Sequence, residues 1–213
     1  MDINWLGHSC FRIKGKESTI ITDPCHPSIG YNLANLQADI VTLSHFHPGH
    51  SYTEAITCDF REIKGPGEYE LQGTFITGIS TFHDADQGKE RGKNTVYLLE
   101  IDGMTLCHLG DIGHLLTSEL IESMGEIDVL FLPVGGVSTI GATRGAEMVR
   151  KLSPKIVIPM HYKTEALTKE LESADKFLRE SGINEIVSQP KLVVNSSNLP
   201  PSTRVIVLDF LRQ

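Results

Sequence analysis

The chain has 213 residues, 40% of them hydrophobic, and a formal net charge of −8. This length can bury one sizeable core, and no proline-rich or serine-rich linker divides the sequence, so we expect a single domain over residues 1–213. The acidic balance and the lack of long lysine or arginine clusters argue against a nucleic-acid partner, and no apolar stretch approaches the length of a membrane span.

Short apolar runs bounded by glycine or polar residues predict strands along most of the chain. In chain order they lie near 3–6, 10–13, 19–22, 40–43, 74–81, 95–101, 104–109, 129–133, 156–160, 191–194 and 205–210. Helices are expected over 118–124, with Thr117 as N-cap and Gly125 as the stop, over 143–152 and over 165–181. The third helix is predicted from an apolar stripe formed by Leu167, Leu171, Ala174 and Leu178. Strands followed by helices, with polar turns at the strand ends, favour an α/β layered domain with its site along one sheet edge.

The most informative motif follows the buried run 40–43. Residues 44–50 read Ser-His-Phe-His-Pro-Gly-His, so three of the nine histidines fall within six residues. If the strand continues, His45 and His47 point to the same side, and the following proline and glycine let the chain turn His50 back towards them. A single histidine would more often be a packed or surface residue, but packing gives no reason to cluster three. The motif therefore predicts a metal site.

Three later apolar runs also end in polar turns. These turns contribute His83, Asp111 and His161. Each could deliver one ligand from the end of a buried strand to a common edge of a sheet, where it would meet the histidines of the motif.

The order of a His-x-His-x-x-His turn, a lone histidine, an aspartate in a Gly-Asp turn and a last histidine after a buried strand resembles the metallo-β-lactamase superfamily. Further segments look like its ascorbate-6-phosphate-lactonase-like branch of metal-dependent hydrolases, namely 5–11, 22–24, 65–69, 91–95 and 133–136. The resemblance runs from about residue 3 to about residue 161. It implies a four-layer αββα metallo-β-lactamase-fold sandwich, which periodicity alone does not show.

The resemblance also implies two adjacent metal sites. Its ligands would be His45, His47 and His83 at the first site, His50 and His161 at the second, and Asp111 as a bridge. An aspartate of the turn usually completes the second site, but this sequence has Gly49 there. A catalytic zinc ion can manage with three protein ligands plus water, so His50, His161 and Asp111 could suffice; a first metal with a weak, exchangeable second one is an equal alternative. Restoring the carboxylate by Gly49→Asp should raise the occupancy of the second site if the turn tolerates a side chain.

Other residues near the motif are candidates for supporting roles. His8, at the end of the first strand, is expected to be an extra ligand or a hydrogen-bond donor to the substrate. Asp23 is expected either to orient a ligand histidine or only to form a turn. His108 is more consistent with packing inside a strand, whereas a direct role stays open for His114. The segment 84–94 has the composition of a surface loop, and its position leaves open a substrate-contacting lid. Such a lid would meet an anion through Arg91, Lys93 or Asn94.

Together these residues predict a metal-dependent hydrolase. Divalent ions lower the pKa of bound water from about 15.7 towards about 7, so a metal-bound hydroxide can attack a small, anionic ester, lactone or phosphodiester. Asp111 and His8 are assigned to catalysis. Zinc is favoured, as one or two ions, although Mn²⁺, Fe²⁺ or Ni²⁺ suit the same ligands. The alternative is a catalytically weakened protein of the same fold that binds a metabolite or regulatory ligand without turnover, which the change to Gly49 would favour.

The cysteines and the N-terminus bear on the compartment. The four cysteines are far apart and form no Cys-x-x-Cys pair, so neither a zinc ribbon nor a disulfide framework is expected. The N-terminus passes directly into residues 3–6 without a basic region and a long apolar stretch, which argues against a signal peptide. We therefore expect a cytoplasmic protein that acts on a small molecule. The oligomeric state stays open, with a homo-oligomer among the options.

Overall fold

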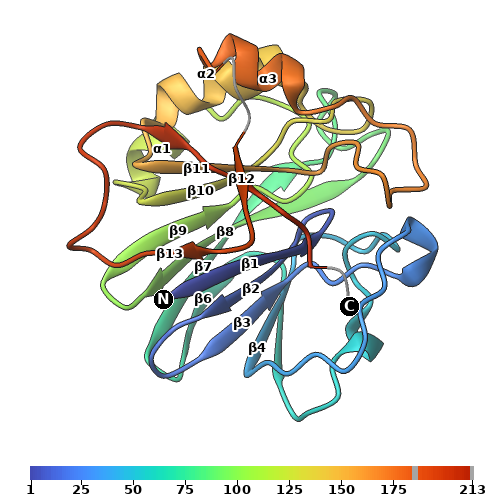
Figure 1. Ribbon diagram of the computed structural model, residues 1–213, viewed down its shortest axis with the longest axis vertical. Helices are drawn as coiled ribbons and strands as arrows, with labels where there is room; N and C mark the ends of the chain where they lie inside the picture. The colour runs from blue at the N-terminus through green and yellow to red at the C-terminus, as the bar shows by residue number, and fades with distance from the viewer. Residues whose placement is uncertain (184–186, 212–213) are drawn as a thin grey trace.

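The computed structural model describes residues 1–183 and 187–211, and its main feature is two β-sheets packed face to face (Figure 1). In spatial order, the first sheet contains β13 (Leu192–Val193), β1 (Asp2–Gly7), β2 (Cys10–Lys14), β3 (Thr19–Thr22), β4 (Ile40–Leu43) and β5 (Arg61–Lys64). The second contains β14 (Arg204–Val205), β11 (Ile156–Met160), β10 (Val129–Pro133), β9 (Met104–His108), β8 (Lys93–Ile101), β7 (Thr74–Phe82) and β6 (Gly67–Leu71). A short third sheet pairs β12 (Ser188–Gln189) with β15 (Val207–Leu208).

Successive residues along a strand of the first sheet pack alternately into two hydrophobic cores. Ile20 and Ile40 belong to the main core, which they share with the second sheet, whereas Ile21 and Val41 belong to a smaller core on the other face. Successive side chains of a strand point to opposite faces, so an apolar run buried on both faces supplies both cores. This explains why short, continuously apolar runs form the central strands.

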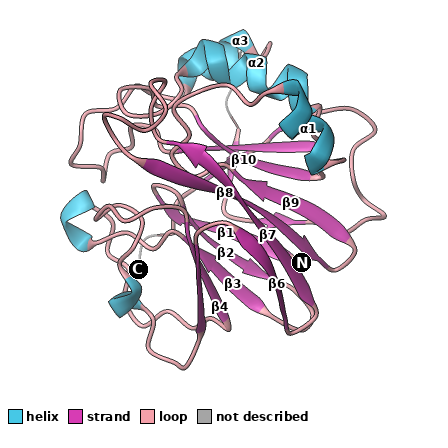
Figure 2. Cartoon of the chain, turned by 180° about the vertical axis from the view of Figure 1, so that it is seen from behind, coloured by secondary structure: helices cyan, strands magenta, loops and turns pink. Residues whose placement is uncertain are grey.

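The helices cover only one of the two outer faces. The segments α1 (Ser118–Met124), α2 (Ala142–Leu152) and α3 (Asp175–Glu180) lie on the side of the seven-stranded sheet (Figure 2). The outer face of the first sheet is covered by irregular chain with two short 3₁₀ helices, η1 (Pro27–Ile29) and η2 (Thr53–Ala55). The predicted layered sandwich is confirmed, and Thr117 caps α1 as predicted. Within the described residues, none of the helices combines the length and apolar composition that crossing a bilayer requires.

The helix predicted over 165–181 is wrong for most of its length, because only its α3 part is helical. The residues of the predicted apolar stripe pack in two different cores. Leu167 packs in the smaller core, and Leu178 packs in the main core. Backbone hydrogen bonds from Thr168 to Ile29 and from Glu172 to Gly135 hold the intervening segment in a non-helical path. Tertiary packing has therefore overridden helical periodicity here.

The candidate site residues lie in the turns that follow β1, β4, β7, β9 and β11. Strands β9, β10 and β11 run parallel, so their C-terminal ends lie along one edge of the second sheet. The backbone N–H of His161, after β11, donates to the carbonyl oxygen of His8, after β1, at 3.1 Å. This bond joins the site-bearing edges of the two sheets.

Candidate metal centre

Asp111 lies at the centre of the predicted site. Its side chain is buried, and its Oδ2 atom lies 3.1 Å from Nε2 of both His50 and His161, 3.3 Å from Nε2 of His83 and 3.8 Å from Nε2 of His45. The four histidines come from three different turns. The structure thus brings one carboxylate oxygen to the middle of four imidazoles.

The possible ligand atoms form two groups around this carboxylate. One group consists of His45, His47 and His83, and the other of His8, His50 and His161, with the ligand atoms of each group within 4.8 Å of one another. His47 is the most exposed of the six residues, and the others are buried. All the histidines predicted as ligands are therefore brought together, and His8 joins the second group.

A third group, Asp23 with His45 and His50, is joined through Ser44 into a hydrogen-bond network. Asp23 is fully buried and accepts hydrogen bonds from the Ser44 backbone N–H at 2.7 Å, the Ser44 hydroxyl at 2.5 Å and His50 Nδ1 at 2.9 Å. The Ser44 hydroxyl in turn accepts from His45 Nδ1 at 2.9 Å. When the two rings are neutral and both Nδ1 atoms act as donors, the Nε2 lone pairs are directed towards Asp111, where a metal ion could take them. The predicted contact between Asp23 and a cluster histidine is confirmed.

Two other side chains fix the Asp111 turn. Asn94 Oδ1 accepts the Asp111 backbone N–H at 2.9 Å, and His108 Nδ1 accepts the Gly110 N–H at 3.3 Å. His108 Nε2 also donates to the carbonyl oxygen of Ser9, next to His8, at 2.9 Å. Because Asn94 is buried and its amide is fully used, it is a positioning residue rather than the anion contact considered for it.

His114 lies outside the cluster. Its Nε2 accepts the backbone N–H of Phe82 at 3.2 Å, and its Nδ1 donates to the carbonyl oxygen of Leu115 at 2.9 Å. Both ring nitrogens are therefore committed to the backbone, which leaves no lone pair for an ion or a substrate.

The protonation states follow from burial and from the two carboxylates. Burial opposes ionisation of Asp111, yet His161 and His50 hold its pKa well below the usual value. Burial also opposes the charged form of His50, but Asp111 and Asp23 raise its pKa to about 9. His45 is different, because burial and its neighbours, His50 foremost, lower its pKa to about 2. The centre thus combines an ionised carboxylate with at least one neutral imidazole.

Several buried polar atoms of this centre lack a hydrogen-bond partner among the described residues. They are both ring nitrogens of His8, Nε2 of His45, Nδ1 of His83, Nδ1 of His161 and Oδ1 of Asp111. Burying polar atoms without partners is unfavourable, so a protein retains such a cluster where something else satisfies it. Imidazole nitrogens and a carboxylate oxygen are donors that zinc and similar divalent ions take. The residues present therefore fit a divalent metal ion.

Comparison with known proteins supports this interpretation. A family model described as "Beta-lactamase superfamily domain" matches residues 2–161. The chain belongs to the metallo-β-lactamase superfamily. Proteins named UPF0173 metal-dependent hydrolase from Thermococcus onnurineus and Thermococcus kodakarensis are 30% and 28% identical to it, in alignments that cover 76% of this chain and 84% of each relative. A crystal structure from Thermotoga maritima, of a protein proposed to be a zinc-dependent hydrolase of this superfamily, shares 39% identity over 97% of both chains with a TM-score of 0.80.

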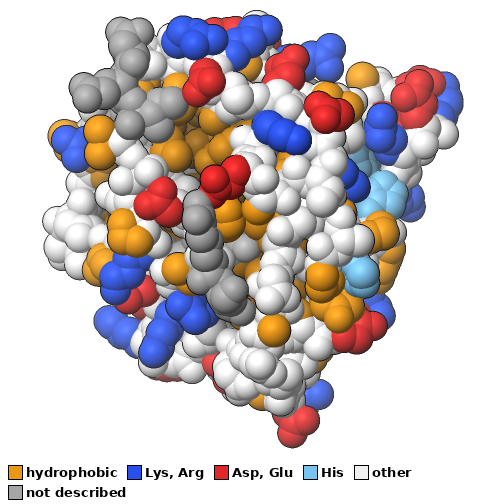
Figure 3. Space-filling view, turned by 45° about the vertical axis from the view of Figure 1, so that its right-hand side comes forward, with side chains coloured by type: hydrophobic (Ala, Val, Ile, Leu, Met, Phe, Trp, Pro, Cys, Tyr) orange, Lys and Arg blue, Asp and Glu red, His pale blue; other side chains and the backbone are white. Residues whose placement is uncertain are grey.

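This member of the superfamily has two small cavities at its histidine cluster. The first, of about 220 Å³, is lined by His47, His50, His83, Asp111 and His161 and by Arg91, Val137, Ser138, Lys169, Glu170 and Leu171. The second, of about 390 Å³, shares His47 and Arg91 and includes Phe46 and Lys93. Figure 3 shows histidine side chains reaching the surface beside basic and apolar ones. Sequence reasoning missed Lys169, because its segment was predicted to be helical.

The loop that follows His83 is held by hydrogen bonds to one of its own side chains, Asp84. The carboxylate of Asp84 accepts four backbone N–H bonds of 2.8–3.0 Å, from Asp86, Gly88, Glu90 and Arg91. Desolvation opposes ionisation of Asp84, but these four donors outweigh it and lower its pKa to about 2. The loop therefore has a defined conformation that places Arg91 at the cavity mouth.

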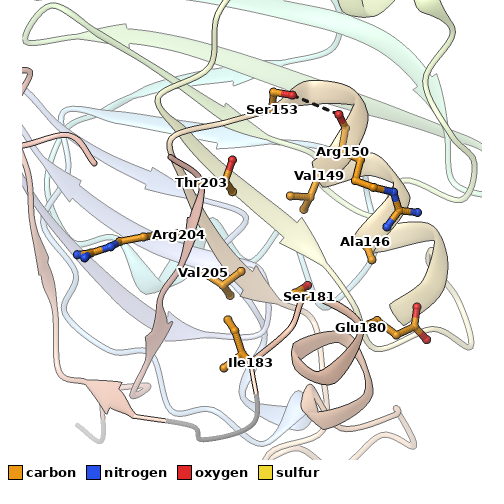
Figure 4. A pocket seen from close by; sticks show the side chains of 10 residues that line it. All are labelled: Ala146, Val149, Arg150, Ser153, Glu180, Ser181, Ile183, Thr203, Arg204 and Val205. Carbon is orange, nitrogen blue, oxygen red and sulfur yellow. Dashed lines mark hydrogen bonds between the residues drawn. The ribbon is translucent and has the colours of Figure 1, made fainter. Parts of the chain in front are cut away.

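A larger cavity of about 730 Å³ lies elsewhere, beside α2, α3 and β14 (Figure 4). It shares no lining residue with the cavities at the histidine cluster. Its charged residues are Arg150, Glu180 and Arg204, and Figure 4 shows the two arginines pointing to opposite sides. Size alone therefore does not identify the functional site of this protein.

Proposed function

We propose that this protein hydrolyses a small anionic ester, lactone or phosphodiester and that its histidine cluster holds one or two divalent ions, preferably zinc. The proposed ligands are His45, His47 and His83 at the first site, His50 and His161 at the second, and Asp111 between them. The observation that carries the proposal is the position of Asp111 Oδ2, 3.1–3.8 Å from Nε2 of four buried histidines. The metal-dependent hydrolases among its relatives support the same reaction class.

The chemistry divides between the ions and the protein. When bound, divalent ions would supply Lewis acidity and make hydroxide available near neutral pH. The protein itself holds the ligands in place: Asp23 keeps the proton of His50 on Nδ1, and Asn94 fixes the turn that carries Asp111. Because the ligand side chains are largely buried, little rearrangement would be needed on binding.

The substrate class is inferred from the cavity mouth. Arg91 and Lys169 are exposed and line the first cavity, whose acidic lining residues are Asp111 of the histidine cluster and Glu170. Two flexible cations beside the ligand cluster favour a substrate with a negative charge. The cavity of about 220 Å³ limits the part of the substrate that it can enclose. The resemblance to the ascorbate-6-phosphate-lactonase-like branch is part of this proposal, since a phosphorylated lactone is both negatively charged and small.

The proposal is tested by a screen of lactones, phosphodiesters and thioesters with the zinc-loaded protein. The comparison is with a His45→Ala/His47→Ala variant and with His26→Ala, which removes an exposed histidine outside the cluster. We expect turnover of one substrate class by the native protein and His26→Ala, and none by the double variant. Equal turnover by all three would identify a contaminating enzyme and refute the assignment.

The alternative, binding without turnover, predicts a different outcome. A native protein that retains zinc, binds an anionic metabolite and yet hydrolyses nothing in the screen would favour it. The alternative is motivated by the lack of a side chain at Gly49. The imidazole of His8 lies beside Gly49, which weakens the case that the site has lost a ligand.

A further inference from the structure

The space beside Gly49 is filled by the imidazole of His8. A Cβ atom placed on Gly49 would lie 2.9 Å from His8 Nε2 and 3.0 Å from His8 Cδ2. Contacts this short require something to move, and the ring of His8 is packed against the rings of His50 and His161, at centroid distances of 5.0 and 4.1 Å. Glycine at position 49 is therefore what allows the imidazole to occupy this space.

The ring of His8 is buried without any hydrogen-bond partner among the described residues. Its residue is only 1% exposed, and neither Nδ1 nor Nε2 has a partner. A packed structural histidine would pair its ring nitrogens, as His108 and His114 do in this molecule. His8 is also absent from the residues that line the two cavities, so its ring is directed at the cluster rather than at a substrate.

The backbone holds His8 in a strained conformation. Its φ of 54° lies in the left-handed region, as does the φ of 52° at His161. The carbonyl oxygen of His8 accepts hydrogen bonds from Trp5 Nε1 at 3.0 Å and from the His161 backbone N–H at 3.1 Å, which fixes the turn. Non-glycine residues held in this region concentrate at functional sites, where the surrounding structure stabilises a strained arrangement.

We infer that His8 is a metal ligand, which completes a three-imidazole site with His50 and His161 beside the shared carboxylate of Asp111. The ligand atoms of these three histidines lie within 4.8 Å of one another. Three histidines are a known ligand set for catalytic zinc. A site with no carboxylate of its own also favours zinc over the oxygen-preferring ions Mg²⁺ and Mn²⁺. The inference rests on the metal-binding part of the proposed function and is independent of the reaction catalysed.

The test compares His8→Ala, His8→Gln, Gly49→Asp and the exchange His8→Ala/Gly49→Asp, with His26→Ala as control. Each protein is stripped, titrated with Co²⁺ while its visible spectrum is followed, and analysed for bound Zn²⁺ after gel filtration. We expect two ions in the native protein and the control. In His8→Ala and His8→Gln, one ion should bind more weakly by at least about 10–100-fold, the loss that follows when only a partner that orients a ligand is removed, and the other ion should bind as before. The exchange variant should regain the second ion, because an aspartate then has room to replace the imidazole.

Gly49→Asp alone should bind no better than the native protein, because its side chain meets His8. Two ions bound by folded His8→Ala and His8→Gln with native affinity would overturn the inference, as would a single ion in the native protein that neither variant weakens. A native protein that binds no ion would refute the metal-binding part of the proposed function as well. Two ions with the expected His8 dependence but no hydrolysis would refute only the proposed reaction.

Discussion

The replacement Asp23→Asn tests whether Asp23 keeps the Nε2 lone pair of His50 available for a metal ion. The carboxylate accepts three hydrogen bonds, two from Ser44 and one from His50 Nδ1. An asparagine has almost the same shape, but it presents an amide N–H₂ group where one carboxylate oxygen accepted. Neutral His50, the form that binds a metal ion, can answer this change by carrying its proton on Nε2 instead of Nδ1. Its Nε2 atom, 3.1 Å from Asp111 Oδ2, would then donate to that carboxylate and lose its lone pair for a metal ion.

The expected magnitudes follow from these contacts. A hydrogen bond to a charged group contributes about 1.5–3 kcal/mol, and a neutral one about 1 kcal/mol. Because rotation of the Ser44 hydroxyl and the tautomer change recover neutral bonds, we expect the metal-free variant to lose about 1–3 kcal/mol of unfolding free energy. Loss of a partner that orients a ligand histidine costs about 10–100-fold in metal affinity, or about 1.4–2.7 kcal/mol.

Two measurements separate these effects. Urea denaturation of the metal-free proteins gives the change in unfolding free energy, and competition with a chromophoric chelator gives the Zn²⁺ affinity of the folded proteins. Histidine ¹⁵N NMR above the pKa of His50, which Asp111 and Asp23 raise to about 9, reports which nitrogen of the neutral ring carries the proton. The matched control is Asp39→Asn, because Asp39 accepts a backbone N–H bond of 2.7 Å from Thr19 outside the cluster. It should alter neither metal affinity nor the His50 tautomer.

Folded Asp23→Asn that binds Zn²⁺ as tightly as the native protein, although its His50 proton has moved to Nε2, would contradict the role of Asp23 in keeping the Nε2 lone pair of His50 available. A loss of stability with unchanged affinity and an unchanged tautomer would instead assign Asp23 a purely structural role. Ser44→Ala should give an intermediate result, since it removes one acceptor and one donor but leaves the Asp23–His50 bond in place.

Three further predictions concern the metal, the cavity mouth and the loop. Removing metal with a chelator should lower the thermal midpoint, and adding Zn²⁺ at about 100 times its Kd should restore about 2.7 kcal/mol of stability by calorimetry; an unchanged midpoint would contradict a filled site. Arg91→Ala and Lys169→Ala should each raise KM for anionic substrates, more at low than at high salt, and leave neutral analogues unaffected in steady-state kinetics. Asp84→Asn should increase hydrogen exchange across residues 84–91, because four backbone N–H groups lose an anionic acceptor; unchanged protection would mean that other contacts hold the loop.

Strands buried on both faces, and strands with a regular alternation of apolar residues such as β7, could be predicted from sequence. The run 40–43 forms β4 with the predicted bounds, and all four of its residues are buried. Strand β5 was missed because only Ile63 of its four residues is buried, so its sequence carries no periodic apolar signal. The helix over 165–181 failed for the opposite reason: its periodicity is present, but its apolar residues belong to two cores.

Site residues at strand ends could be predicted because residue type and position carry the signal together. Asp111 and His161 each follow a buried strand, and the fold brings them to one edge. The relation between His8 and Gly49 could not be predicted from spacing, because it depends on how the turn after β1 packs against the turn after β4. The sequence pattern draws attention to Gly49, but the group that fills the space beside it is set by tertiary structure.

The ligand set also bears on why the substrate should be anionic in a protein of net charge −8. Asp111 is the one carboxylate among the proposed ligands, and the others are imidazoles, which are neutral when they bind a metal. Two divalent ions carry four positive charges, so three would stay uncompensated by ligands if both sites are filled. Arg91 and Lys169 add further positive charge at the mouth of the first cavity. The acidic surface would repel extended polyanions, whereas a small anion that reaches the mouth meets a strongly positive field. On the proposed function, local charge at the centre and net charge of the chain would together favour a small anionic substrate over nucleic acid.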